Sequence, residues 1–78
     1  MSIFIGEEIK RVVKERNVTT AWLARELRCH RTNIYRIYNS ASVDTNILLR
    51  LSIILHHNFF STYNDLVNRM IDADGRKV

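Results

Sequence analysis

The feature that most constrains the fold is the near absence of residues that break helices and form tight turns. The chain of 78 residues has no proline, and its only glycines, Gly6 and Gly75, lie near the two ends. A sheet built from several hairpins therefore has little support, because glycine and proline mark most tight turns. Two distant glycines cannot form the glycine-rich motif of a nucleotide-binding loop. The sequence predicts an all-α protein.

The length and the single cysteine limit how such a chain can be stabilised. Seventy-eight residues suit one small domain, and Cys29 has no second cysteine with which to form a disulfide. We therefore predict a single domain over residues 1–78 that is stabilised by helix packing. The sequence has no run of about 18 apolar residues and no signal-peptide pattern at its start, which favours a cytoplasmic protein without a membrane segment.

Apolar residues recur at helical spacing in five segments. The predicted helices cover about residues 5–16, 20–27, 31–38, 45–56 and 61–73. Thr19 and Asp44 are the predicted N-caps of the second and fourth helices, because their side-chain oxygens can accept hydrogen bonds from free backbone N–H groups. Asn17 is the predicted end of the first helix. Residues 39–43 are predicted to form a loop, and residues 74–78 a frayed tail.

Basic residues are concentrated in the middle of the chain. The net charge is +4, but residues 10–50 hold nine Lys and Arg against Glu15, Glu26 and Asp44, which is +6. Such an excess suits the binding of DNA phosphates, because their neutralisation releases condensed counterions. A basic surface that is merely solvated is the alternative.

The segment 31–38 is unusually polar for a helix of a small domain. Only Ile34 and Ile37 are predicted to face the core. Arginine can pair with guanine, asparagine with adenine, and threonine offers a hydroxyl and a methyl group to bases. This composition favours a helix that enters the major groove of DNA. The side chains outside the inward pair are Arg31, Thr32, Asn33, Tyr35 and Arg36.

A known pattern runs through residues 19–37, whose sequence is Thr-Thr-Ala-Trp-Leu-Ala-Arg-Glu-Leu-Arg-Cys-His-Arg-Thr-Asn-Ile-Tyr-Arg-Ile. It resembles the helix-turn-helix of phage Cro and lambda-repressor-type regulators, most specifically at Leu23, Ala24, Leu27, Ile34 and Ile37. The likeness covers about residues 5–60 and extends to small regulators of the Bacteroidetes type. It implies a compact five-helix lambda-repressor-like domain, with the helix-turn-helix at about residues 19–38. The implied function is that of a repressor-like transcription regulator that binds duplex DNA sequence-specifically.

Two positions depart from that pattern. Arg28 stands where the family has the glycine of the turn, so we expect it to accept a left-handed backbone at a modest cost. His30 stands where the family has a serine cap, and a neutral imidazole can accept a hydrogen bond there. A cationic ring would instead oppose the helix dipole.

The resemblance implies two sets of DNA contacts, of which base contacts set the sequence preference and phosphate contacts set the register. The alternative for each residue is an ordinary solvated side chain, or for Tyr35 a ring packed across its helix. The base-contacting set is Arg31, Thr32, Asn33 and Arg36. The phosphate-contacting set is Thr20, Asn39 and Ser40, with His30 and Tyr35 as second-rank members.

The sequence contains no pattern typical of a metal site or of a catalytic site. Cys29, His30, His56 and His57 lack the spacing of a zinc site, so we expect no metal. Cys29 falls where the family places valine and is predicted to be a small buried hydrophobe, and Trp22 is predicted to be a packing residue. No nucleophile lies in a pattern with a base, so we expect no catalytic residues, no cofactor and no enzyme.

Leu49 and Ile53 leave the helix 45–56 apolar nearly all round, so either the last helix covers this face or another chain does. Phe59, Phe60, Leu66, Met70 and Ile71 extend the same apolar region. We predict a homodimer on a pseudo-palindromic operator, with the C-terminal helix as a dimerisation element and a protein partner at that surface as an alternative. Two other functions remain open, an antitoxin that uses the same domain and a helical adaptor that does not bind DNA.

Overall fold

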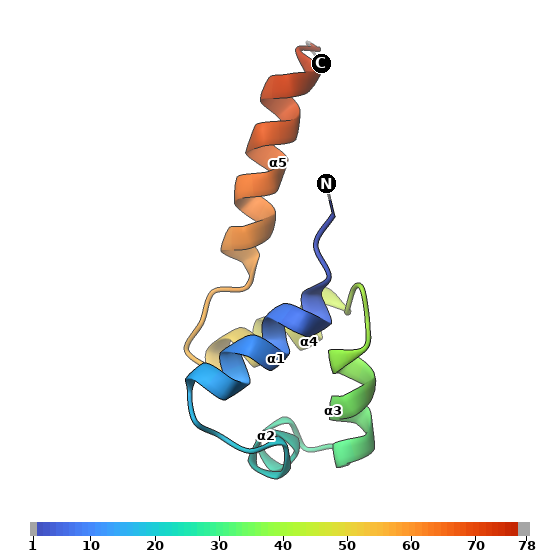
Figure 1. Ribbon diagram of the computed structural model, residues 1–78, viewed down its shortest axis with the longest axis vertical. Helices are drawn as coiled ribbons and strands as arrows, with labels where there is room; N and C mark the ends of the chain where they lie inside the picture. The colour runs from blue at the N-terminus through green and yellow to red at the C-terminus, as the bar shows by residue number, and fades with distance from the viewer. Residues whose placement is uncertain (1, 77–78) are drawn as a thin grey trace.

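The computed structural model describes residues 2–76, which form five helices (Figure 1). No strand occurs among these residues, so the all-α prediction is confirmed. None of the described helices is long and apolar enough to cross a membrane. The helices are α1 (Ile5–Glu15), α2 (Thr20–Leu27), α3 (Arg31–Tyr38), α4 (Thr45–Ile54) and α5 (Phe60–Asp74).

The predicted helix boundaries are correct to within two residues. α4 ends at Ile54, two residues before the predicted end, and Asp74 closes α5 although it was predicted to begin the tail. Of that tail, residues 77 and 78 lie outside the described residues. Gly75 follows α5 with φ +67°, the left-handed conformation that glycine commonly adopts after a helix.

The first four helices form a body around one core (Figure 1). α1 contributes the apolar stripe that its i, i+3, i+4 pattern predicts, and α2, α3 and α4 each add residues from one face. Phe59, from the segment before α5, is fully buried in the same core. The buried residues are Ile5, Ile9, Val12, Val13, Leu23, Ala24, Leu27, Ile34, Tyr38, Leu48, Leu51, Leu55 and Phe59.

The start of α1 abuts the end of α3 at Gly6. The backbone N–H of Gly6 donates to the carbonyl of Ser40 at 3.0 Å, and that of Ile5 donates to the carbonyl of Ala41 at 3.2 Å. A Cβ atom at position 6 would lie 2.6 Å from the carbonyl carbon of Tyr38, well inside van der Waals contact. Glycine is therefore required here by the close approach of two helices. In the sequence, Gly6 was notable only for its position near one end of the chain.

Thr19 and Asp44 cap the starts of α2 and α4 as predicted. The Thr19 hydroxyl accepts from the backbone N–H of Trp22 at 3.0 Å. The Asp44 carboxylate accepts from the N–H of Asn46 at 2.7 Å and from that of Ile47 at 3.3 Å. Asn17, beyond the end of α1, has φ +56°, which a short polar side chain tolerates well.

Arg16 joins the end of α1 to the end of α4. Its Nε donates to the carbonyl of Leu55 at 2.9 Å, and its Nη2 donates to the carbonyl of His56 at 2.8 Å. These carbonyls follow the last turn of α4, where acceptors have no partner within the helix. The guanidinium therefore fixes the course of the chain as it leaves α4.

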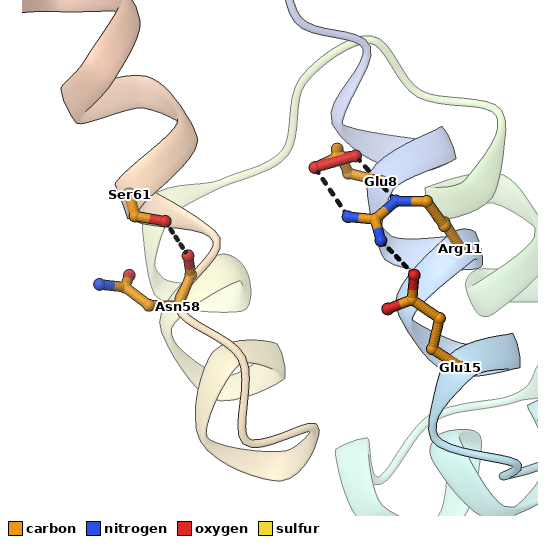
Figure 2. Close-up of polar contacts among 5 residues, drawn as sticks. All are labelled: Glu8, Arg11, Glu15, Asn58 and Ser61. Carbon is orange, nitrogen blue, oxygen red and sulfur yellow. Dashed lines mark hydrogen bonds and ion pairs between the residues drawn. The ribbon is translucent and has the colours of Figure 1, made fainter.

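The helix α5 projects from the body, and the molecule extends 46 × 20 × 19 Å (Figure 1). Its first turn is anchored by Asn58, whose side-chain oxygen accepts from the N–H of Phe60 at 3.0 Å. The Ser61 hydroxyl donates to the Asn58 carbonyl at 2.8 Å (Figure 2). No residue of α5 is buried. Phe59, which was predicted to extend the apolar region of α4 together with residues of the last helix, lies instead in the core at the base of α5.

Candidate nucleic-acid interface

The turn between α2 and α3 depends on a strained residue. Arg28 has φ 59° and ψ 51°, so the expected left-handed backbone at the position of the family's glycine is confirmed. The backbone N–H groups of Arg28 and Cys29 donate to the carbonyls of Arg25 at 3.2 Å and Ala24 at 2.9 Å. These bonds close α2 and offset the cost of the conformation, which is about 1–2 kcal/mol for a residue with a Cβ atom.

α3 turns one face to the core and the other to solvent. Ile34 and Tyr38 are buried and lie one turn apart, while Ile37 is half-buried on the flank. At 100° per residue, the direction opposite to this buried face falls between Thr32 and Arg36, which are also one turn apart. The exposed residues of α3 are Arg31, Thr32, Asn33, Tyr35 and Arg36, which are the same polar residues that the sequence placed outside the core.

The predicted base-contacting residues do not all point the same way. Thr32 and Arg36 form the central ridge, with Arg31 on the flank nearer the buried face. Asn33 lies on the other flank, where it lines a groove between α3 and α4 together with Ser42 and Arg50. Arg36 borders the same groove, so this residue connects the ridge with the groove.

Thr20, predicted to contact phosphate, has a partner within the chain. Its hydroxyl oxygen lies 3.2 Å from the phenolic oxygen of Tyr38, and either group can donate. The two hydroxyls carry two protons and the bond between them uses one, so one proton is left for an acceptor such as a phosphate. Burial raises the pKa of the Tyr38 phenol, against the smaller opposite effect of the hydrogen bond with Thr20. The phenol therefore stays protonated at neutral pH.

The residues that follow α3 close its last turn. Asn39 Nδ2 donates to the carbonyl of Tyr35 at 3.0 Å, and the Ser40 hydroxyl donates to the carbonyl of Arg36 at 2.7 Å. The Asn39 amide keeps a second N–H, but the only proton of the Ser40 hydroxyl is in use. Because a phosphate oxygen only accepts, Ser40 must break its bond to Arg36 before its side chain can contact phosphate.

His30 and Tyr35, the second-rank phosphate candidates, are both exposed. His30 occupies the N-cap position of α3, but its imidazole does not make the capping hydrogen bond that the sequence allowed. Tyr35 packs its ring edge-on against Tyr38, with the ring centroids 6.1 Å apart, and 54% of Tyr35 remains exposed. The Tyr35 hydroxyl is therefore accessible beside the exposed face of α3.

Sequence reasoning missed two residues that organise this surface. Tyr38 lies one turn after Ile34 on the same helical face, so its spacing alone marks it as inward. Arg50 Nη2 donates to the carbonyl of Leu27 at 2.9 Å and so ties α4 to the end of α2. No local pattern reveals the contact between Arg50 and Leu27, because it joins residues 23 positions apart.

Other charged and polar groups serve the fold. Arg11 donates to the carboxylates of Glu8 and Glu15 on the exposed face of α1 (Figure 2). Cys29 is half-buried and packs against the core, so it is less enclosed than predicted. Across residues 2–76, no three His, Cys, Asp or Glu side chains gather as a metal site would require.

Comparison with models of protein families identifies a DNA-binding domain in the chain. The sequence model of the Cro/C1-type helix-turn-helix DNA-binding domain matches residues 8–59, which include α2, α3 and α4 in full. No curated protein and no solved structure matches the chain significantly. The matched segment contains the strained turn at Arg28 and the exposed face of α3.

Proposed function

Because this chain belongs to the Cro/C1-type helix-turn-helix DNA-binding domain family, we propose that it regulates transcription by reading duplex DNA with α3. Thr32 and Arg36 form the ridge that enters the major groove, with Arg31 and Asn33 at its flanks. Arginine donates two hydrogen bonds to guanine and asparagine pairs with adenine, so this helix carries the side chains for base recognition.

The observation that carries the proposal is the contrast between the two faces of α3. Ile34 and Tyr38 anchor the helix in the core, while two arginines and three other polar side chains lie exposed on its remaining surface. A packing helix has no need of so many donors, and a reading helix requires both the donors and the rigid support.

Phosphate contacts would come from residues around this helix. Thr20 and Tyr38 share one free hydroxyl proton, and Asn39 keeps one free amide N–H. His30, at the N-cap of α3, and Tyr35, within α3, are both exposed and carry polar atoms. Ser40 is the least favoured of the predicted phosphate contacts, because its hydroxyl proton is donated to the carbonyl of Arg36 at the end of α3.

The proposed regulator binds as a homodimer to a pseudo-palindromic operator. Two copies related by a two-fold axis would present two α3 helices to half-sites about 34 Å apart. The uncovered apolar surfaces described below support a second copy, and they lie outside the proposed DNA-reading face.

Selection of binding sites from a random duplex library tests the proposal directly. We expect a pseudo-palindromic consensus, and we expect Arg36→Ala to weaken binding to that site by about 1–3 kcal/mol and to relax preference at one base pair. Arg69→Ala is the matched control, since it removes the same charge from an exposed arginine of α5 that lies away from α3 and on the opposite side of α5 from Val67, Met70 and Ile71. If Arg31→Ala and Arg36→Ala both bind the selected site as tightly as the unaltered chain, α3 is not the reading helix.

A further inference from the structure

The outer half of α5 has an apolar face that the rest of its own chain does not cover. Val67, Met70 and Ile71 are 51%, 57% and 60% exposed. They line a shallow groove whose other walls are Asp74 and Arg76, so no residue of the body reaches it. An isolated helix of 15 residues is marginal in water, and most helical stability in proteins comes from packing of the apolar face. This half of α5 therefore needs a partner.

A second uncovered apolar surface lies on α4. Leu49 is 49% exposed and Ile53 is 66% exposed, although both lie on a helix that is otherwise part of the core. The two residues are four positions apart and form one ridge along the helix. The possibility that the last helix covers this face in the same chain is thereby excluded, since α5 leaves both residues open.

The base of α5 is fixed in a direction that leads away from this ridge. Phe59 is fully buried, and its backbone N–H approaches the Ser52 hydroxyl at 3.4 Å. Asn58 caps the first turn of α5, and Arg16 holds the carbonyls at the end of α4. To fold α5 back onto its own α4, the chain would have to break these contacts.

We propose that the outer half of α5 packs on the Leu49–Ile53 ridge of a second copy, so that two copies exchange their C-terminal helices. The exchange describes the interface of the homodimer that the proposed function requires, and it therefore rests on that proposed function. One two-fold axis makes both contacts equivalent, and each copy covers the exposed ridge of the other.

Shape favours this pairing. Val67 and Ile71 are four positions apart, as are Leu49 and Ile53, so both surfaces carry the i, i+4 ridges that interlock in the commonest class of helix packing. The two contacts cover ten half-exposed apolar side chains, each with on the order of 80 Å² of accessible surface. These side chains supply about 800 Å², so the polar residues at the rim need to add only about 200 Å² to reach the roughly 1,000 Å² that a specific interface requires.

Charge favours α4 over a second α5 as the surface that receives α5. Residues 60–76 carry three aspartates against Arg69 and Arg76, which is −1, whereas residues 2–59 carry nine basic and five acidic residues, which is +4. Arg50 is the only charged residue of α4. Two α5 helices side by side would bring together two segments of like charge, while α5 on the partner's α4 brings together opposite charges.

Sedimentation of the full chain at 1–100 µM tests the exchange. We expect a dimer of twice 9.2 kDa, and we expect Ile53→Lys and Met70→Glu each to weaken dimerisation at least tenfold. An equimolar mixture of the two variants should regain much of the dimer. In the mixed pair one contact has the original residues, and the other faces Lys against Glu.

Asn68→Glu is the matched control, because it adds the same charge to the polar face of α5 and should leave the dimer unchanged. The altered positions are all exposed, and circular dichroism should give the same helix content for each variant. The exchange is overturned if Ile53→Lys dimerises as well as the unaltered chain, or if the unaltered chain is monomeric at 100 µM. A monomer that still binds duplex DNA overturns the exchange and the homodimer but leaves DNA reading by α3 standing, and a dimer that binds no duplex overturns DNA reading alone.

Discussion

Gly6→Ala adds one methyl group at the point where α1 meets the end of α3. The added carbon would lie 2.6 Å from the Tyr38 carbonyl carbon, whereas carbon atoms in contact lie about 3.5–4.0 Å apart. The two backbones must therefore separate by about 1 Å. That separation lengthens the bonds from the Gly6 and Ile5 N–H groups, now 3.0 and 3.2 Å, beyond hydrogen-bonding distance.

The cost of this change follows from three contributions. Two lost hydrogen bonds cost about 1 kcal/mol each. Overpacking against a backbone that cannot rotate away adds about 1–3 kcal/mol. Alanine is the better helix former and returns about 1 kcal/mol. The net loss is about 2–4 kcal/mol, a large part of the roughly 4–12 kcal/mol available to a chain of this length.

Urea unfolding monitored by Trp22 fluorescence measures the effect. With a slope of about 1 kcal/mol per molar urea, the midpoint should fall by about 2–4 M. Gly75→Ala is the control, because a Cβ atom there meets open space and its φ of +67° costs at most about 1–2 kcal/mol at the end of α5. The reasoning fails if Gly6→Ala unfolds at the same midpoint as the unaltered chain or at a higher one.

Three further changes test other contacts. Asp44→Ala removes the acceptor for two N–H groups of α4 and should cost about 0.5–2 kcal/mol by thermal unfolding, while Asp44→Asn should restore most of it. Arg16→Lys replaces a forked donor with a point charge and should cost about 1 kcal/mol, since one of the two carbonyls at the end of α4 loses its partner. Burial raises the pKa of Tyr38 above its ordinary 10.0, so the phenol contributes stability that is present below pH 10 and lost as the pH rises through the folded pKa. Tyr38→Phe should therefore lose less stability above pH 10 than the unaltered chain does, and equal losses in urea midpoints would contradict this.

The helices were predictable because the signals that define them are local. An apolar stripe repeats every three or four residues in α1, and the caps at Thr19 and Asp44 act on N–H groups two or three positions away. The left-handed turn at Arg28 followed from its position in a known pattern. The caps and the spacing of the stripe are decided within about one helical turn of sequence, and the turn at Arg28 within the helix-turn-helix pattern.

The remaining features depend on contacts between distant segments. Nothing near Gly6 in the sequence indicates that its backbone touches the end of α3, because that contact spans more than 30 residues. The hydrogen bond between Thr20 and Tyr38 also joins distant segments, since the two residues are 18 positions apart. It leaves the two hydroxyls one free proton between them for a contact with phosphate. For α5, the stripe of Val67, Met70 and Ile71 shows that a face must be covered, but periodicity does not show which chain covers it.

The charges of the body and of α5 make the molecule an electric dipole along its 46 Å axis. In the field of a polyanion such a dipole experiences a torque before any contact forms. The basic body, with α2 and α3 away from the tip of α5, turns toward the phosphates, and the acidic helix turns away (Figure 1). Encounters would thus be oriented at a distance, and added salt would screen this orienting field at separations beyond the Debye length, which is about 10 Å at 0.1 M.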